Sequence, residues 1–348
     1  MNWRRLLTVP GFVIVWALWI AATPVWLVVS VVVDGVRRSR GVALRSSSLF
    51  AVYLTCEVLG IAASVGFWIW GKVYRLDDRS WTDLHFRLEA WWGATLFWSV
   101  VRLFELRLEI EGENEADLGH GPYLLLPRHT SSGDTLLASA IVSRPYGIRL
   151  RYVLKQENLW DPCLDIVGNR VPNAFIDRFS SDSRAEIVAV QSIARDLGPR
   201  DGVLTYPEGT RFSADKRNRV IERLRAKRDE GLLEQAESLQ FVLPPRLGGT
   251  LGILDAAPEI DVVFCSHTGF EGAASLAEIW NGTLVGQVIR VRFRRIPRAE
   301  IPRDRAGQID WLLEEWRRVD AWVGANRGMS SSRKDARKIS SNSDRFPS

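Results

Sequence analysis

A histidine followed five residues later by an aspartate is the pattern in this chain best suited to acid–base chemistry: His129 and Asp134. Histidine titrates near neutrality, so a neutral imidazole can take a proton from an alcohol. A neighbouring carboxylate would fix its tautomer and stabilise the imidazolium that forms. The apolar run Tyr123–Pro127 predicts a buried strand ending just before the histidine, with Ser131, Ser132 or Asp134 capping the next helix. A plain loop histidine and an aspartate that only caps a helix would show the same pattern.

A second pattern lies downstream, where Pro207 and the tetrapeptide Glu208-Gly209-Thr210-Arg211 follow the apolar stretch Val203–Tyr206. The proline ends the predicted strand, and the glycine permits a sharp turn. Arg211 carries a permanent charge on a planar fork that suits a phosphate. An ordinary turn with a solvated arginine would look the same in isolation. Its place downstream of the His129 and Asp134 pair favours a joint role, a base beside a phosphate-binding turn.

Two further segments complete an ordered series: Phe175-Ile176-Asp177-Arg178 lies between the two patterns, and Val242-Leu243-Pro244-Pro245-Arg246 follows them. With these four blocks, over roughly residues 100 to 325, the chain resembles the glycerolipid acyltransferases, the lysophosphatidic acid acyltransferase superfamily. The segment Leu243–Gly249 and the expected strand Val291–Pro297, which leads to Ile301-Pro302, resemble the subgroup of lysophosphatidylglycerol and lysocardiolipin acyltransferases. The chain departs from the family pattern at Arg128, where asparagine is usual, and at Pro172, where glycine is usual.

The resemblance implies direct acyl transfer without a metal or a cofactor, with acyl-CoA or acyl-carrier protein as co-substrate. His129 would deprotonate the acceptor hydroxyl, which attacks the thioester carbonyl, while Asp134 orients the imidazole. The resemblance also implies substrate-binding residues in the second and third blocks. Arg178 and Arg211 would hold the acceptor phosphate, Glu208 would position its glycerol part, and Gly209 would let the backbone approach closely. Thr210 of the same turn is a further substrate-binding candidate. Lys155, after the predicted strand Leu150–Leu154, is a further phosphate candidate or a solvated strand-end lysine.

The N-terminal segment 1–75 is mostly apolar and predicts a membrane anchor. Gly11–Val33 contains no charged residue, and Leu49–Gly71 is interrupted only by Glu57. Each run is long enough to cross a hydrocarbon layer. The first is too long for a signal peptide and lacks a clear cleavage site. Two buried core helices are the alternative. The arginines between the two runs favour a cytoplasmic location for the loop that joins them. If both runs crossed the membrane, the catalytic part would then lie on the opposite side, away from thioester donors. A re-entrant hairpin would instead keep the catalytic part on the cytoplasmic face.

Charge is distributed unevenly along the chain, whose formal net charge is +5. Residues 1–48 contain six arginines and one aspartate, and residues 327–348 contain six basic and two acidic residues. The basic excess therefore lies beside the apolar segments and in the tail, which suits anionic lipid and argues against nucleic acid. We expect membrane-anchoring helices over 1–75, an acyltransferase domain over 76–326 and a disordered basic tail over 327–348.

After residue 100, strand and helix patterns alternate. Strands are expected at 106–111, near 124, 151 and 203, and at 260–266 and 284–296; helices are expected at 134–142, 184–196, 214–238 and 305–324. This alternation predicts an α/β fold, a mixed sheet flanked by helices and preceded by a hydrophobic helical hairpin. The short apolar stretch Ala90–Val101 is expected to pack on the domain or lie in the membrane interface. The three cysteines form no metal or disulfide pattern.

The expected function is a membrane-bound acyltransferase that acylates the free hydroxyl of a lysophospholipid. The favoured acceptor is 1-acyl-glycerol-3-phosphate, which would give phosphatidic acid. One alternative is the remodelling of another lysophospholipid, such as lysophosphatidylglycerol. A catalytically silent lipid-binding scaffold is the other. A serine hydrolase is disfavoured because the chain contains no Gly-x-Ser-x-Gly nucleophile elbow.

Overall fold

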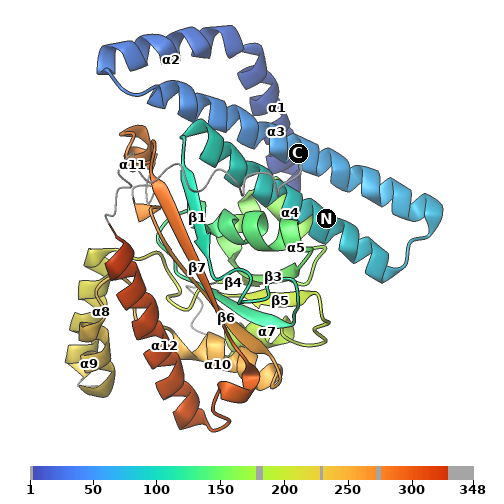
Figure 1. The fold of residues 1–348 in the computed structure, drawn as a ribbon. Helices are drawn as coiled ribbons and strands as arrows, with labels where there is room; N and C mark the ends of the chain where they lie inside the picture. The colour runs from blue at the N-terminus through green and yellow to red at the C-terminus, as the bar shows by residue number, and fades with distance from the viewer. Residues whose placement is uncertain (1–2, 178–182, 228–229, 272–275, 328–348) are drawn as a thin grey trace.

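A computed structural model describes residues 3–177, 183–227, 230–271 and 276–327. Its centre is a seven-stranded mixed sheet in the order β1-β7-β6-β2-β5-β3-β4 (Figure 1). Among the strands in these ranges, β6 and β7 pair antiparallel and the other neighbours pair parallel. The strand bounds are β1 Arg107–Glu111, β2 Tyr123–Pro127, β3 Arg149–Lys155, β4 Ala174–Ile176, β5 Asp201–Leu204, β6 Asp261–Thr268 and β7 Val288–Ile296. The predicted mixed α/β sheet is thereby confirmed.

Helices cover both faces of this sheet, because successive side chains of a strand point to opposite faces. In β2, Tyr123 and Leu125 join a core with Phe97 of α4 (Asp78–Leu103). Leu124 and Leu126 join a second core that includes Trp316. The helices of this second face are α7 (Ser183–Ser192), α10 (Leu247–Ala256) and α12 (Arg305–Asn326).

Two predicted helices differ from expectation. The segment 134–142 is not one α-helix: it begins as the 3₁₀ turn Gly133–Leu136 and continues as the π-helix Ser139–Ser143 before the short α5 (Arg144–Tyr146). Asp134 receives two backbone N–H groups of the preceding loop, which favours the tighter first turn. The segment 214–238 forms two helices that pack together, α8 (Ala214–Lys227) and α9 (Glu230–Ser238). Two further short helices are α6 (Pro162–Gly168) and α11 (Leu276–Trp280).

The apolar N-terminal segment forms three helices, α1 (Trp3–Ala21), α2 (Thr23–Arg37) and α3 (Val42–Tyr74). The uncharged run 11–33 is therefore not a single helix. It breaks at Ala22, and Pro24 lies in the first turn of α2, where its missing N–H costs nothing. Both α1 and α2 pack against α3 (Figure 1). By length and composition alone, α1 and α3 could each cross a membrane.

Much of the apolar surface of these three helices is exposed, including Leu18 at 65% and Val28 at 64%. The predicted stretch Ala90–Val101 lies within α4, where Ala94, Leu96 and Phe97 are buried against the domain. Of the predicted tail 327–348, residues 328–348 lie outside the described residues.

Buried polar contacts join the N-terminal helices to α6. Arg5 of α1 donates from Nε to Oδ2 of Asp165 at 2.8 Å. Glu57 of α3 accepts the indole N–H of Trp92 at 2.8 Å and the backbone N–H of Cys163 at 3.0 Å. Helix α6 is thus held by both α1 and α3, and it lies next to the cavity described below.

Candidate active site

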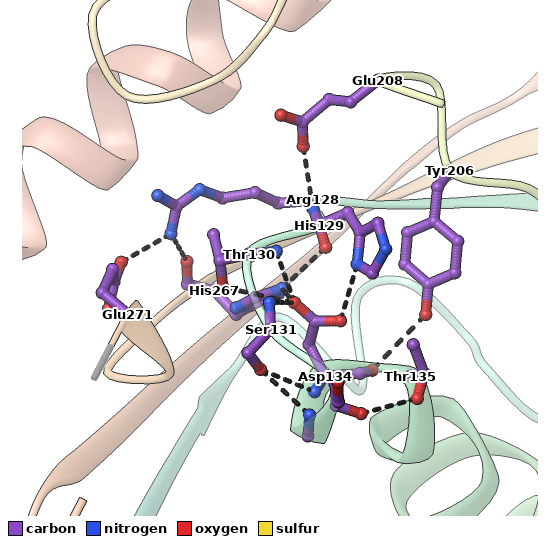
Figure 2. Close-up of polar contacts among 12 residues, drawn as sticks. Arg128, His129, Thr130, Ser131, Asp134, Thr135, Tyr206, Glu208, His267 and Glu271 are labelled. Atoms are coloured by element: carbon purple, nitrogen blue, oxygen red, sulfur yellow. Dashed lines mark hydrogen bonds and ion pairs between the residues drawn. The ribbon is translucent and has the colours of Figure 1, made fainter. Parts of the chain in front are cut away.

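His129 and Asp134 form a buried hydrogen-bonded pair in the loop that follows β2. Oδ1 of Asp134 lies 2.9 Å from Nδ1 of His129, and Oδ2 accepts the backbone N–H of Thr130 and of Ser131 at 2.5 and 2.7 Å (Figure 2). Burial alone would raise the pKa of Asp134, yet its hydrogen bond with His129 and the nearby charges hold the pKa below its usual range. The aspartate is therefore ionised, and Nε2 of His129 is left for a substrate.

Tyr206 lies beside the histidine ring. The two ring centroids are 4.3 Å apart at an interplanar angle of 33°. The tyrosine hydroxyl donates to the backbone carbonyl of Asp134 at 3.5 Å (Figure 2). The imidazole is thus confined by a carboxylate at its edge and an aromatic ring at its face.

Glu208 contacts the backbone of the histidine loop. Its Oε1 accepts the N–H of His129 at 2.8 Å, and its Oε2 accepts the N–H of Leu243 at 2.9 Å. The side chain is buried, and burial raises its pKa, whereas the two backbone amides that donate to its oxygens lower the pKa and favour the ionised form. Both oxygens face backbone amides, so the described geometry gives Glu208 the role of joining the first, third and fourth blocks.

The rest of this turn is shaped by Gly209. Its φ of +67° lies in the left-handed region, and a Cβ there would come within 2.5 Å of Nε of Arg246. The Thr210 hydroxyl accepts from Nζ of Lys216 at 3.1 Å. Arg211 donates from Nη1 to the hydroxyl of Ser132 at 2.9 Å.

A cavity of about 350 Å³ lies in front of the histidine. His129, Arg211 and Lys155 all line it, so the structure brings the candidate base and two of the three candidate phosphate-binding cations together. Glu208 and Thr210 do not line it, and Gly209 lines a neighbouring cavity. The third cation, Arg178, lies outside the described residues. Trp92, Leu136 and Leu164 are among the apolar residues of the wall.

Glu89 lines the same cavity and was not among the residues expected from the sequence. Its Oε1 accepts the side-chain N–H of Asn173 at 2.8 Å, and burial raises its pKa to about 8. It is therefore protonated at neutral pH. Nothing in its sequence setting, a helix with mixed apolar and charged residues, marks this carboxyl as unusual.

Arg128, one of the two departures from the pattern described above, is fully buried and anchors the loop that carries His129. Its Nη1 donates to the carbonyl of His267 at 2.8 Å and to Oε1 of Glu271 at 2.7 Å. Nε and Nη2 donate to the carbonyl of Phe241. The long Arg128 side chain thus joins the loop that carries His129 to β6 and to the residue just before the fourth block. An asparagine side chain is too short to make these contacts.

His267 is a second histidine at this site. Its Nε2 donates to the carbonyl of Arg128 at 2.7 Å and lies 3.7 Å from Oδ2 of Asp134 (Figure 2). Burial lowers its pKa, so it is neutral, and its Nδ1 is buried without a partner among the described residues. Only the folding of β6 beside β2 could reveal it, because it lies far from His129 along the chain.

Residues 107–246 match the family model described as Acyltransferase. The fold is similar to the crystal structure of the 1-acyl-sn-glycerophosphate (LPA) acyltransferase PlsC from Thermotoga maritima, with a TM-score of 0.51 and 12% sequence identity. That match covers 83% of this chain and 100% of the Thermotoga chain. No curated protein matches the chain significantly by sequence. Residues 107–246 therefore match an acyltransferase family model, and the chain has a fold similar to that of the Thermotoga protein.

Proposed function

We propose that this protein is a membrane-bound acyltransferase that transfers a fatty acyl group from a thioester donor to the free hydroxyl of a lysophospholipid, with 1-acyl-glycerol-3-phosphate as the favoured acceptor. The observation that carries the proposal is the His129–Asp134 pair at a cavity also lined by Arg211 and Lys155. A base and two cations in one cavity suit a hydroxyl and a phosphate of the same acceptor.

In the proposed reaction, Nε2 of His129 takes the proton of the acceptor hydroxyl as its oxygen attacks the thioester carbonyl. Asp134 stabilises the imidazolium through Nδ1. The C–S bond of the resulting tetrahedral intermediate then breaks, the new ester forms, and the imidazolium returns the proton to the leaving thiolate. Positioning of the acceptor by the cavity supplies much of the remaining acceleration.

The exposed apolar surface of α1, α2 and α3 supports membrane attachment, because a large contiguous apolar patch is unfavourable in water. We place the catalytic domain on the cytoplasmic face, where thioester donors are available. Acyl-CoA and acyl-carrier protein remain the two candidate donors. Lysophosphatidylglycerol, suggested by the subgroup resemblance, is the alternative acceptor.

Membranes that contain the protein test the proposal. Labelled acyl-CoA or acyl-carrier protein is offered with lysophosphatidic acid and a panel of other lysophospholipids. We expect labelled phosphatidic acid from the wild type and none from His129→Ala. His120→Ala is the matched control, because the side chain of this histidine is 79% exposed and pairs with the exposed Asp117. If no acceptor is acylated while the protein still binds anionic lipid, the silent scaffold is the better description.

A further inference from the structure

A second cavity, of about 110 Å³, lies next to the one that contains His129. The two cavities share Tyr206 and Val153 as lining residues. Its other walls come from β4, α7, the turn after β5 and the start of α10. Before α10, the residues that line these walls are the apolar Ile176, Ile187 and Val190 and the turn residues Thr205, Pro207 and Gly209. The proposed mechanism uses none of the residues that are unique to it.

The start of α10 has an uncapped N-terminus at this cavity. The N-cap residue, Arg246, makes no side-chain capping bond. The first N–H groups of an α-helix have no partner within the helix, and they attract anions together with the helix dipole. Gly249 lines the cavity and leaves this backbone uncovered, since a Cβ added there would meet no heavy atom within 4 Å. The N-terminal turn of α10 is therefore open to a ligand.

Thr250 is an independent indication of a ligand. The residue is only 1% exposed, and its hydroxyl oxygen is buried without a hydrogen-bond partner in the described part of the chain. It also lines the cavity. Buried hydroxyl groups in folded proteins nearly always have a partner, so an unpaired one facing a cavity points to a group that is bound there.

Arg246 supplies a positive charge at the same place. Its backbone N–H donates to the carbonyl of Pro207 at 2.8 Å, and its side chain lies over Gly209 and lines the cavity. Across the described ranges it forms no ion pair with a carboxylate. The charge is thus held beside the turn and is available to an anion.

We propose that this cavity binds a phosphate monoester group through the N-terminal amides of α10, the hydroxyl of Thr250 and the guanidinium of Arg246. Amides, a hydroxyl and a forked cation converging on a small cavity suit the several oxygens of a tetrahedral dianion. The physiological source of the group rests on the proposed function. It is either a phosphate of a CoA donor, with the acceptor phosphate at Arg211 and Lys155, or the acceptor phosphate itself, in which case those two cations bind a phosphate of the donor. The binding itself does not depend on acyl transfer.

Calorimetric titration of the full-length protein in detergent with glycerol 3-phosphate and with inorganic phosphate, at constant ionic strength, tests the site. Thr250→Val is nearly isosteric and removes an unpaired hydroxyl, so the variant should fold at least as well as the wild type. We expect Thr250→Val and Arg246→Gln each to raise Kd by about tenfold or more, as for the loss of one charge-assisted hydrogen bond. Arg219→Gln, at an exposed arginine of α8, is the matched control and should bind as the wild type does.

Absence of phosphate binding to the wild type, or unchanged binding in both cavity variants, would overturn the proposal. In acyl-transfer assays, a higher KM of Thr250→Val for lysophosphatidic acid assigns the group to the acceptor, and a higher KM for acyl-CoA assigns it to the donor. If phosphate binds as expected but no acyl group is transferred to any acceptor, the site stands and the proposed function fails. The two ideas are therefore separable.

Discussion

The backbone N–H of His129 donates to Oε1 of Glu208, which joins two motifs 79 residues apart in the chain. The other carboxyl oxygen of Glu208 accepts the N–H of Leu243 in the fourth block. Three of the four blocks therefore meet at one side chain. The acidic residue of the Glu-Gly-Thr-Arg turn positions the backbone that carries the candidate base, and its carboxyl does not line the cavity in front of that base.

Replacement of Glu208 by glutamine tests this role. A glutamine amide has one acceptor oxygen, so either His129 or Leu243 would face an NH₂ group and lose its acceptor. We expect the free energy of unfolding to fall by about 1–3 kcal/mol and kcat to fall with little change in KM. Thermal unfolding and steady-state kinetics measure the two effects. A variant with wild-type stability and a raised KM would instead assign Glu208 to acceptor binding.

Replacement of Asp134 by asparagine tests the orienting carboxylate. The amide keeps the size of the side chain but removes the charge that stabilises the imidazolium, and it can hold the ring in the wrong tautomer. We expect kcat to fall by about 10²–10⁴-fold, the range typical of a lost general base. Asp117→Asn, at the carboxylate that pairs with exposed His120, should leave the rate unchanged. Near-normal turnover by Asp134→Asn would contradict the proposed mechanism.

Replacement of Gly209 by alanine tests the turn. The left-handed φ costs an L-residue about 1–2 kcal/mol, and the new Cβ must also displace the side chain of Arg246. We expect a lower melting temperature and weaker phosphate binding in the neighbouring cavity. Gly231→Ala in α9 is the matched control, since its Cβ would meet nothing within 4 Å and alanine favours a helix. If the two variants were equally stable, the turn would accommodate an alanine at residue 209 without cost, and the prediction would be wrong.

The buried carboxyl of Glu89 predicts a pH dependence. Its pKa is raised from the usual 4.5 to about 8, so the folded state binds a proton that the unfolded state has released between these values. Stability should therefore fall as the pH rises from about 4.5 toward 8, and level off above that. Melting curves of the wild type and of Glu89→Gln across this range measure the effect, because the neutral variant keeps the acceptor for Asn173. Identical pH profiles would mean that Glu89 ionises normally.

The neutral imidazole of His267 is expected to position the catalytic pair through the carbonyl of Arg128. His267→Phe keeps a ring in this buried space but removes the N–H donor. We expect kcat to fall by about tenfold while KM is unchanged, since about 1–2 kcal/mol of hydrogen bonding holds the loop. His267→Gln, which retains an N–H donor, should restore part of the rate. If both variants instead lost folded protein to the same extent, His267 would have only a packing role in the core and no role in positioning His129.

The parts of the site that could be predicted are those encoded locally. The strand before His129 and the turn at Gly209 each follow from a few adjacent residues. The mixed sheet follows from the alternation of strand and helix patterns along the chain. Arg128, Glu271 and His267 could not be found this way, because their contacts depend on β6 lying beside β2. Asp320 of α12 is similar, since it accepts the backbone N–H groups of residues 240–242 from far along the chain.

The N-terminal segment shows a different limit. Hydropathy identifies the uncharged run 11–33, but hydropathy alone does not locate the break between two helices within such a run. Pro24 was the local signal for the start of α2, and the 3₁₀ and π turns after Asp134 had no comparable marker. The resemblance implied a substrate contact for Glu208, and nothing in the sequence indicated that its two oxygens also accept backbone amides of distant segments.

The contacts that Arg5 and Glu57 make with α6 have a practical consequence for handling this protein. Deletion of the apolar helices to obtain a soluble domain would leave Asp165 buried without its cation and expose Trp92, which lines the cavity in front of His129. A truncated domain should thus lose the shape of the cavity in front of His129. The N-terminal helices and the α/β domain share buried contacts, so biochemical work on this protein calls for the whole chain.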